Sequence, residues 1–269
     1  MRTLVHLSDI HFGRVDPALV EPLIQSINEI RPDLVTISGD LTQRARTYQF
    51  KEARAFLDAL PRPQIIVPGN HDVPLYNFFA RFFQPLDKYR RYITKDLQPF
   101  YADGEIAVAG VSTARSLTIK GGRVNRSQIH WLRDNFCPLP NEITKIVVTH
   151  HPFDLPEGHA ESDLVGRARL AMEALATCGA DLFVAGHLHI SHIGHTAKRY
   201  NIKGHSALVI QAGTAASTRV RGEANSFNVI RIAHPEIVVN RLEWQTDRQS
   251  FVPTTRERFR HLPEGWMRE

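Results

Sequence analysis

The sequence predicts an α/β fold, and two features of the chain support this prediction. Five short apolar runs of strand length, rich in β-branched residues, lie at residues 3–7, 34–37, 64–67, 146–149 and 182–185. Stretches with helical periodicity lie between these runs. Strands that alternate with helices in this way are typical of α/β proteins.

Helix signals fall where the alternation requires them. Asp16 followed by Pro17 marks a helix start, and apolar residues recur at helical spacing across residues 20–30. A second apolar face covers residues 50–60 and ends at a proline. A third helix is expected at residues 167–178, because a glycine follows it directly.

The last part of the chain reads as strands. Short β-like runs occupy residues 208–211, 226–232 and 236–242. No linker or repeat interrupts the alternation, so we expect a single domain over residues 1–269. Residues 247–269 are rich in arginine, and we expect a basic tail whose charges are solvated.

Each of the five apolar runs is followed by polar residues that could bind metal. The clusters are Asp9-Ile10-His11, Gly39-Asp40, Gly69-Asn70-His71-Asp72, His150-His151-Pro152 and Gly186-His187-Leu188-His189. The carboxyl ends of strands in α/β sheets are where ligands bind, so the five clusters should meet at one site.

The residue types in these clusters indicate the metals. Carboxylate, imidazole and amide oxygen suit Mn²⁺, Fe²⁺/Fe³⁺ or Zn²⁺, and no thiolate is present. The carboxylate of Asp40 has two oxygens and could bridge two cations. Two metals about 3.5–4 Å apart can hold a phosphate and generate hydroxide at neutral pH.

The five clusters resemble the D-x-H, G-D, G-N-H-[DE], H-x-P and G-H-x-H motifs of the calcineurin-like metallophosphoesterases. The resemblance extends from Asp9 to His189 and implies a four-layer αββα sandwich of two mixed sheets flanked by helices. It implies one metal on Asp9, His11, Asp40 and His189, and a second on Asp40, Asn70, His150 and His187. It also implies that His71 assists the leaving oxygen and that Asp72 steadies the ring of His71.

Two neighbouring histidines compete for one ligand position. The family pattern places the ligand two residues before Pro152, which selects His150. On an extended segment His151 would point the other way, so it is a candidate either for supporting the ligands from behind or for contact with the substrate. Asn70 and Arg81 are further candidates for substrate binding. His192 and His195 could line the cleft but are not expected to be ligands.

A softer motif at residues 122–132 is similar to the G-x-[VIL]-x-x-x-Q-[LI]-x-W-L segment of bacterial cyclic-nucleotide and glycerophosphodiester phosphodiesterases. It favours this bacterial branch over the Ser/Thr protein phosphatases. Those carry G-D-x-V-D-R-G, whereas residues 39–44 here read Gly-Asp-Leu-Thr-Gln-Arg.

Residues 74–92 depart most from a minimal domain. Pro74 is expected to open a helix with Leu75, Phe78, Phe79, Phe82 and Phe83 on one face. We expect this face to pack on the domain. The alternatives are a lid or a homodimer contact beside the site, because an exposed aromatic face marks a partner or lipid site.

Composition sets the compartment and excludes some partners. The net charge of +5 favours anionic substrates but is too small to argue for nucleic acid. Cys137 and Cys178 lack paired spacing and are expected to be free thiols in a reducing compartment. No apolar run approaches a membrane span, and the first strand begins too early for a secretory signal. We therefore expect a cytoplasmic protein.

These observations favour a phosphodiesterase with two divalent metal ions, in which a metal-bridging hydroxide attacks a small phosphodiester. The substrates implied by the resemblance are 3′,5′- or 2′,3′-cyclic nucleotides and glycerophosphodiesters. A phosphomonoesterase or a nuclease of the same superfamily is the alternative. A non-catalytic binding module of the same fold is a remote third, because the chain keeps both the metal positions and His71.

Overall fold

The computed structural model describes residues 1–219 and 222–269 of the chain. Among these residues, one sheet has seven strands in the order β13-β12-β11-β10-β1-β2-β3. Its strands β1, β2 and β3 are parallel, whereas β10 to β13 are antiparallel. Their bounds are β1 (Arg2–Leu7), β2 (Leu34–Ile37), β3 (Gln64–Ile66), β10 (Ser226–Ala233), β11 (Glu236–Gln245), β12 (Ser250–Leu262) and β13 (Gly265–Arg268).

The second sheet has six strands in the described residues, in the order β4-β5-β6-β7-β9-β8. Strands β5, β6, β7 and β9 are parallel, and the edge strands β4 and β8 are antiparallel to their neighbours. Their bounds are β4 (Phe100–Ala102), β5 (Ile106–Gly110), β6 (Thr144–Val148), β7 (Ala180–Ala185), β8 (His192–His195) and β9 (Leu208–Gln211).

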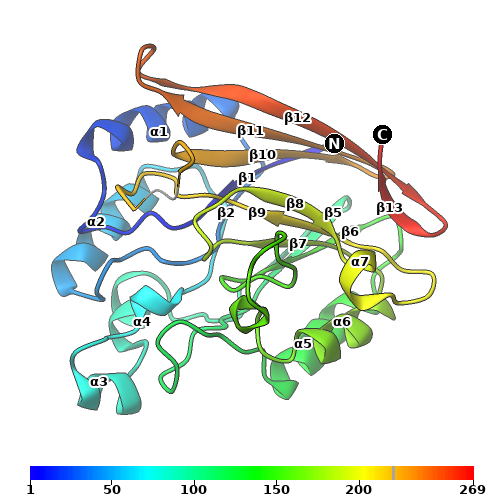
Figure 1. The fold of residues 1–269 in the computed structure, drawn as a ribbon, viewed down its shortest axis with the longest axis horizontal. Helices are drawn as coiled ribbons and strands as arrows, with labels where there is room; N and C mark the ends of the chain where they lie inside the picture. The colour runs from blue at the N-terminus through cyan, green and yellow to red at the C-terminus, as the bar shows by residue number, and fades with distance from the viewer. Residues whose placement is uncertain (220–221) are drawn as a thin grey trace.

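The two sheets lie face to face with helices on their outer sides (Figure 1). Helices α1 (Pro17–Ile30) and α2 (Thr47–Asp58) cover the seven-stranded sheet, and α5 (Arg126–Phe136) and α6 (Ala168–Ala176) cover the other. The short helices are α3 (Phe78–Phe83), α4 (Asp87–Tyr92) and α7 (Ala197–Tyr200), with 3-10 turns at Asn70–Asp72 and Glu161–Asp163.

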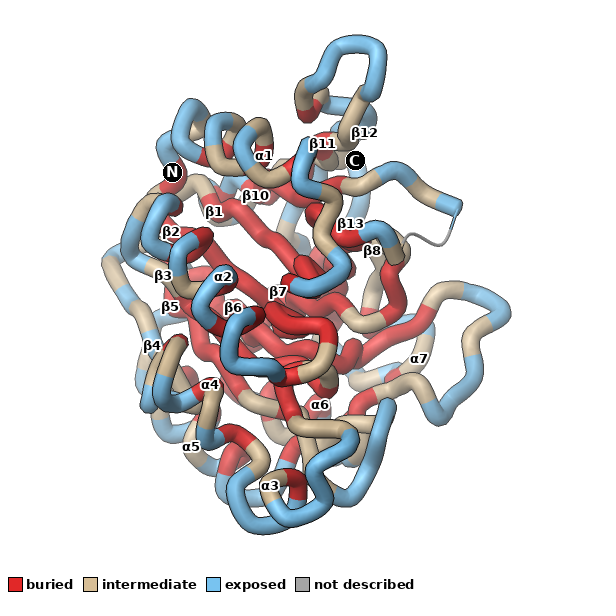
Figure 2. The backbone as a smooth tube through the Cα atoms, turned by 90° about the vertical axis from the view of Figure 1, so that its left-hand side faces the viewer, coloured by how far each residue is buried: buried red, intermediate tan, exposed pale blue. Residues whose placement is uncertain are grey.

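Three apolar cores follow from this layering. One core lies between the sheets and includes Leu4, Val148 and Ile230, and the other two lie between each sheet and its helices. The buried backbone in Figure 2 is concentrated in the strands accordingly. The predicted four-layer αββα sandwich of two mixed sheets is therefore confirmed.

The C-terminal segment differs from the prediction. Residues expected to form a basic tail lie in β12 and in the edge strand β13 of the seven-stranded sheet. Arg260 makes ion pairs with Glu236 and with Glu269, the latter at 2.9 Å between Nε and Oε1. The periodicity of residues 250–262 was obscured by alternating arginines, which the sheet accommodates on its exposed face.

The aromatic stripe after the Asn70 motif also differs from the prediction. It forms two short helices, α3 and α4, in place of one, and α3 lies outside the two-sheet core (Figure 1). Phe78, Phe79, Phe82 and Phe83 are 72%, 66%, 49% and 73% exposed. The expectation that this face packs on the domain was wrong.

The two cysteines are paired. Cys137, directly after α5, forms a disulfide with Cys178, which follows α6. The expectation of free thiols was wrong, because spacing along the chain does not show that the helix ends meet. The cysteines therefore give no support to the predicted cytoplasmic location, which stays a prediction. In the described ranges, every helix is too short or too polar to cross a bilayer.

Candidate metal centre

Four predicted ligands meet at the carboxyl ends of β1, β2 and β7. The ligand atoms of Asp9, His11, Asp40 and His189 all lie within 4.8 Å of one another. Nε2 of His11 is 3.2 Å from Nε2 of His189, which is itself 3.2 Å from Oδ1 of Asp9. Two ligand atoms held about 2.1 Å from one cation at a tetrahedral angle lie about 3.4 Å apart. The spacing of this group fits a cation.

The other three predicted ligands form a second group beside the first. Oδ1 of Asn70 lies 3.0 Å from Nε2 of His150 and 3.1 Å from Nδ1 of His187. These two ring nitrogens are 3.3 Å apart. Nδ1 of His150 contacts the carbonyl oxygen of Ser38 at 2.8 Å, so it donates there and leaves Nε2 as the lone-pair atom.

Asp40 lies between the two groups. Its Oδ1 is 3.4 Å from Nε2 of His150, and its Oδ2 is 3.7 Å from Nε2 of His11. Oδ2 of Asp40 and Oδ1 of Asp9 are buried without a hydrogen-bond donor. A buried carboxylate oxygen with no donor is costly unless a cation compensates it. The residues present therefore fit a pair of divalent cations that share Asp40.

The backbone of the site is strained in a consistent way. Five of the seven predicted ligands have positive φ, at 53° for Asp9, 56° for His11, 52° for Asp40, 75° for His187 and 60° for His189. Such conformations cost about 1–3 kcal/mol each in residues other than glycine and cluster at functional sites. Here they turn the side chains inward directly after each strand.

Two glycines allow the loops that carry the predicted ligands to pack against one another. A Cβ added to Gly69 would collide with the Asp40 carboxylate, and one added to Gly186 would collide with the side chains of Ser8 and Asp9. Both positions therefore require glycine because another loop of the site occupies the space of a side chain.

The electrostatics favour metal-binding protonation states at Asp9, Asp40 and His187. At His189, by contrast, burial acts to lower the pKa, but the charge and close approach of Asp9 outweigh it and raise this pKa. Burial acts to raise the pKa of Asp9, but the charge of His189 and the close approach of the His189 and His11 rings outweigh it and hold this pKa well below its usual range. Burial likewise opposes the lowered pKa of Asp40, which neighbouring histidines produce. Burial, followed by repulsion from His150, lowers the pKa of His187 to about 3, so its ring is neutral.

His71 lies at the edge of the metal groups, with partners that differ from those predicted. Its Nδ1 contacts the carbonyl oxygen of Gln43 at 2.9 Å, and because a carbonyl only accepts, Nδ1 carries the proton. Nε2 accepts from Nη1 of Arg219 at 2.9 Å. Burial is the main cause that lowers the pKa of His71.

Asp72 does not contact the His71 ring. Its carboxylate accepts from the backbone N–H groups of Leu41, Thr42 and Gly69, at 3.2, 2.8 and 2.9 Å. Burial, followed by the charge of Asp40, raises the pKa of Asp72 to about 7. The predicted role of steadying the imidazole was wrong. Asp72 holds together the two loops that carry Asp40 and Asn70.

The candidates for substrate contact have mixed outcomes. Asn70 lines two adjoining cavities of about 210 and 250 Å³ at the metal groups. His151 instead contacts the hydroxyl of Thr113 at 2.8 Å and the carbonyl oxygen of Lys120 at 2.7 Å, so both its ring nitrogens are engaged. Arg81 is buried and donates to the carbonyl oxygens of Pro74 and Thr118. Neither His151 nor Arg81 lines these cavities.

Three cations at the cleft were missed in the sequence. Arg219 and Lys120 line both cavities with Asn70 and His71, and Arg44 lines one of them. The backbone of Arg219 is fixed to the site because its carbonyl oxygen accepts from Nδ1 of His189 at 2.9 Å. Arg219 and Lys120 belong to none of the five clusters, and Arg44 ends the run 39–44 that was read only as a difference from the Ser/Thr protein phosphatases. Only the fold brings the three together.

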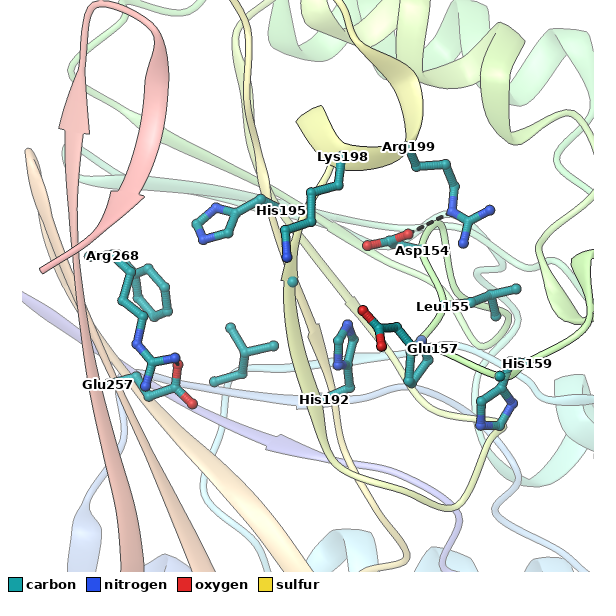
Figure 3. A pocket seen from close by; sticks show the side chains of 15 residues that line it. Asp154, Leu155, Glu157, His159, His192, His195, Lys198, Arg199, Glu257 and Arg268 are labelled. Carbon is teal, nitrogen blue, oxygen red and sulfur yellow. Dashed lines mark hydrogen bonds and ion pairs between the residues drawn. The ribbon is translucent and has the colours of Figure 1, made fainter.

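A larger cavity of about 740 Å³ lies elsewhere, between β8, β12, β13 and the loop at residues 154–159 (Figure 3). His192, His195 and Lys198 project into it from β8 and α7, and Arg199 pairs with Asp154 at 2.6 Å. It contains none of the predicted metal ligands. His192 and His195, which could have lined the cleft at the metal groups, line this other cavity instead.

The two-sheet sandwich places this donor set at its strand ends, which is the arrangement that the five motifs implied. Comparison with known families agrees, because the sequence model for calcineurin-like phosphoesterases matches residues 2–191. The chain belongs to the calcineurin-like phosphoesterase family, as its five motifs predicted.

Individual relatives are distant. The chain is 25% identical over 171 residues to the glycerophosphodiester phosphodiesterase GpdQ of Enterobacter lignolyticus, a match that covers 60% of each chain. It is 25% identical to a probable cyclic nucleotide phosphodiesterase of Rhodopseudomonas palustris, with 69% of this chain and 70% of the relative covered. These relatives are consistent with the predicted bacterial branch. The chain thus spans about three fifths of the length of GpdQ.

Solved structures support the fold. A purple acid phosphatase from yellow lupin superimposes with a TM-score of 0.71 at 11% identity, over 95% of this chain and 53% of the lupin chain. A dimetal phosphatase from Danio rerio superimposes with a TM-score of 0.65 at 13% identity, over 94% of this chain and 98% of the fish protein. At these identities the likeness concerns the fold alone.

Proposed function

We propose that this protein is a phosphodiesterase that hydrolyses small phosphodiesters at two divalent cations shared by Asp40. One observation carries the proposal: the two carboxylate oxygens of Asp40 face two adjacent groups of donors, one containing His11 and the other His150. The names of the relatives supply the substrate class, which is cyclic nucleotides or glycerophosphodiesters.

The residues that would hold the cations are those predicted by the motifs. Asp9, His11, Asp40 and His189 would hold one, and Asp40, Asn70, His150 and His187 the other. When bound, two such cations neutralise phosphate charge and acidify water at neutral pH. The size of the adjoining cavities, about 210 and 250 Å³, favours a small ester over a polymer.

Two positively charged side chains line the same cavity as the predicted ligands. Arg219 and Lys120 share it with Asp40 and His189, so they can orient an anionic substrate there. His71 is fixed by Gln43 with Nε2 toward the cleft. Once Arg219 turns to the substrate and Nε2 takes up a proton from solvent, this nitrogen can donate that proton to the leaving oxygen.

A substrate panel tests this proposal. Metal-stripped protein is reconstituted separately with Mn²⁺, Fe²⁺ and Zn²⁺ and assayed on bis-p-nitrophenyl phosphate, 3′,5′- and 2′,3′-cyclic AMP, glycerophosphocholine and p-nitrophenyl phosphate. We expect metal-dependent cleavage of at least one diester, faster than of the monoester. The proposal fails if every diester stays intact, or if only the monoester is cleaved.

His71→Ala refines the same assay. We expect kcat on the best diester to fall by about 10²–10⁴-fold while the metal content is unchanged, because His71 acts on the leaving group and not on the cations. His130→Ala is the matched control, since His130 is exposed on α5 away from the cleft. An unchanged kcat for His71→Ala would remove this residue from the mechanism.

A further inference from the structure

Exposed apolar side chains gather at one edge of the metal cleft. Among the described residues, 13 large apolar side chains are exposed, and seven of them lie in residues 74–92 and in the connection 111–125 between β5 and α5. We name these two segments the aromatic rim. Its exposed apolar members are Tyr76, Phe78, Phe79, Phe82, Phe83, Leu117 and Ile119.

The aromatic rim is also strongly cationic. It contains seven of the chain's 33 lysines and arginines but only one of its 28 acidic residues, Asp87. Arg90, Arg91 and Lys120 are exposed. Exposed aromatic side chains combined with a one-sided positive charge are typical of segments that bind anionic membrane surfaces.

The two segments of the rim are fixed to each other and to the cleft. Arg81, the buried residue of α3, donates to the carbonyl oxygens of Pro74 and Thr118 and so joins the segments. Nδ2 of Asn70 donates to the carbonyl oxygen of Ile119 at 3.2 Å. Leu75 and Ile119 line the cavity beside His71. The apolar surface is therefore continuous with the wall of the cleft.

We propose that the aromatic rim docks on an anionic lipid bilayer. The phenylalanines of α3 enter the headgroup region, and Arg90, Arg91 and Lys120 meet anionic headgroups. This contact places the mouth of the metal cleft against the membrane surface. A second copy of the chain fits the rim less well, because pairing the same surface in a symmetric dimer brings like charges together.

Vesicle sedimentation tests this proposal without reference to catalysis. The full chain is mixed with vesicles of phosphatidylcholine alone or of phosphatidylcholine with phosphatidylglycerol. We expect binding to the mixed vesicles that weakens as salt is added, and little binding to neutral vesicles. Absence of binding to the mixed vesicles at low salt would overturn the proposal.

Variants separate the apolar and ionic parts. Phe79→Ser with Phe83→Ser should abolish binding, and Arg90→Gln with Arg91→Gln should weaken it by about 30-fold. Leu170→Ser with Leu262→Ser is the matched control, since both side chains are 41% exposed outside the rim. Equal binding by all three double variants would contradict the proposal. Sedimentation velocity gives a second test. If the wild type were a dimer and only the phenylalanine variant were a monomer, the rim would bind a second copy of the chain, and the proposal would be contradicted.

Because binding is measured without substrate, this result is independent of the proposed function. A protein that binds vesicles but cleaves no diester would keep the docking surface and lose the phosphodiesterase. A protein that cleaves soluble diesters but does not bind vesicles would keep the proposed phosphodiesterase activity and lose the docking surface.

Discussion

Arg219 belongs to none of the motifs, yet its guanidinium contacts the imidazole of His71 and its carbonyl oxygen holds the ring of His189. Arg219 lies outside the five motif clusters, yet it contacts both His71, the candidate acid, and His189, a candidate metal ligand. Among the described residues, Arg219 is the one positively charged residue of the cleft whose backbone contacts a predicted metal ligand.

Arg219→Ala should lower kcat/KM for the best diester by about 10–100-fold while leaving the metal content unchanged, because it removes a charged donor to the phosphate and not a ligand. Steady-state kinetics with metal analysis measures both effects. Arg248→Ala, at an exposed turn between β11 and β12, is the control. Loss of metal together with activity would show instead that the Arg219 side chain is needed to hold the donor groups in place.

Gly186→Ala tests whether the site requires a residue without a side chain at this position. The added methyl group collides with Ser8 and Asp9, and overpacking of this kind costs about 1–3 kcal/mol. We expect a lower melting temperature and weaker metal binding. At Gly104 an added Cβ has no neighbour within 4 Å, so Gly104→Ala should change neither. Equal effects of the two variants would contradict the account of Gly186.

Much of the site was predictable at the residue scale. The ligands directly follow strands, so local sequence reports both their chemistry and their shared edge. Asp72 and Arg81 have contacts other than those expected, because their partners come from distant segments. Asp72 contacts the backbone at Leu41 and Thr42, and Arg81 contacts Thr118. Spacing along the chain carries no information about such partners.

At the scale of elements, Asp181 at the start of β7 connects the two sheets. It accepts from Nε1 of Trp266 in β13 at 2.8 Å and from the backbone N–H of Lys145 in β6 at 2.8 Å. Burial raises its pKa to about 6 from an ordinary value of 3.8. One of the strands that Asp181 joins is β13, whose residues were predicted to form a solvated tail.

This raised pKa predicts a pH dependence of stability. Between pH 3.8 and about 6 the unfolded carboxyl loses its proton while the folded one keeps it, so the free energy of unfolding falls as pH rises and levels off above the folded pKa. The contribution is about 3 kcal/mol at most. Urea unfolding of the wild type and Asp181→Asn from pH 4 to 8 measures it. Parallel pH profiles for the two proteins would contradict this assignment.

The elements that sequence reading identified well share strong local signals. Strand β2 and helix α1 have the predicted bounds, because a short β-branched run and an Asp-Pro start mark them clearly. Helix α3 is shorter than predicted and exposed, because periodicity reveals an amphipathic face but not what covers it. The disulfide was missed for the same reason, since only the packing of α5 beside α6 brings Cys137 to Cys178.

On the scale of the whole molecule, the sandwich brings loops from both sheets to one edge. The seven-stranded sheet supplies Asp9, His11, Asp40 and Asn70, and the six-stranded sheet supplies His150, His187 and His189. Since each donor group draws from both sheets, the candidate metal centre depends on how the two sheets pack together. The aromatic rim flanks this edge, so the proposed catalytic and docking surfaces adjoin.

Metal content is the most direct test of the central claim that Asp40 is shared by two cations. Protein purified without chelators and supplied with Mn²⁺ is analysed by mass spectrometry for bound metal and by anomalous scattering from crystals. We expect two ions per chain, both adjacent to Asp40, and at most one after Asp40→Ala. Two ions retained by Asp40→Ala, or ions located away from this carboxylate in the wild type, would contradict the account.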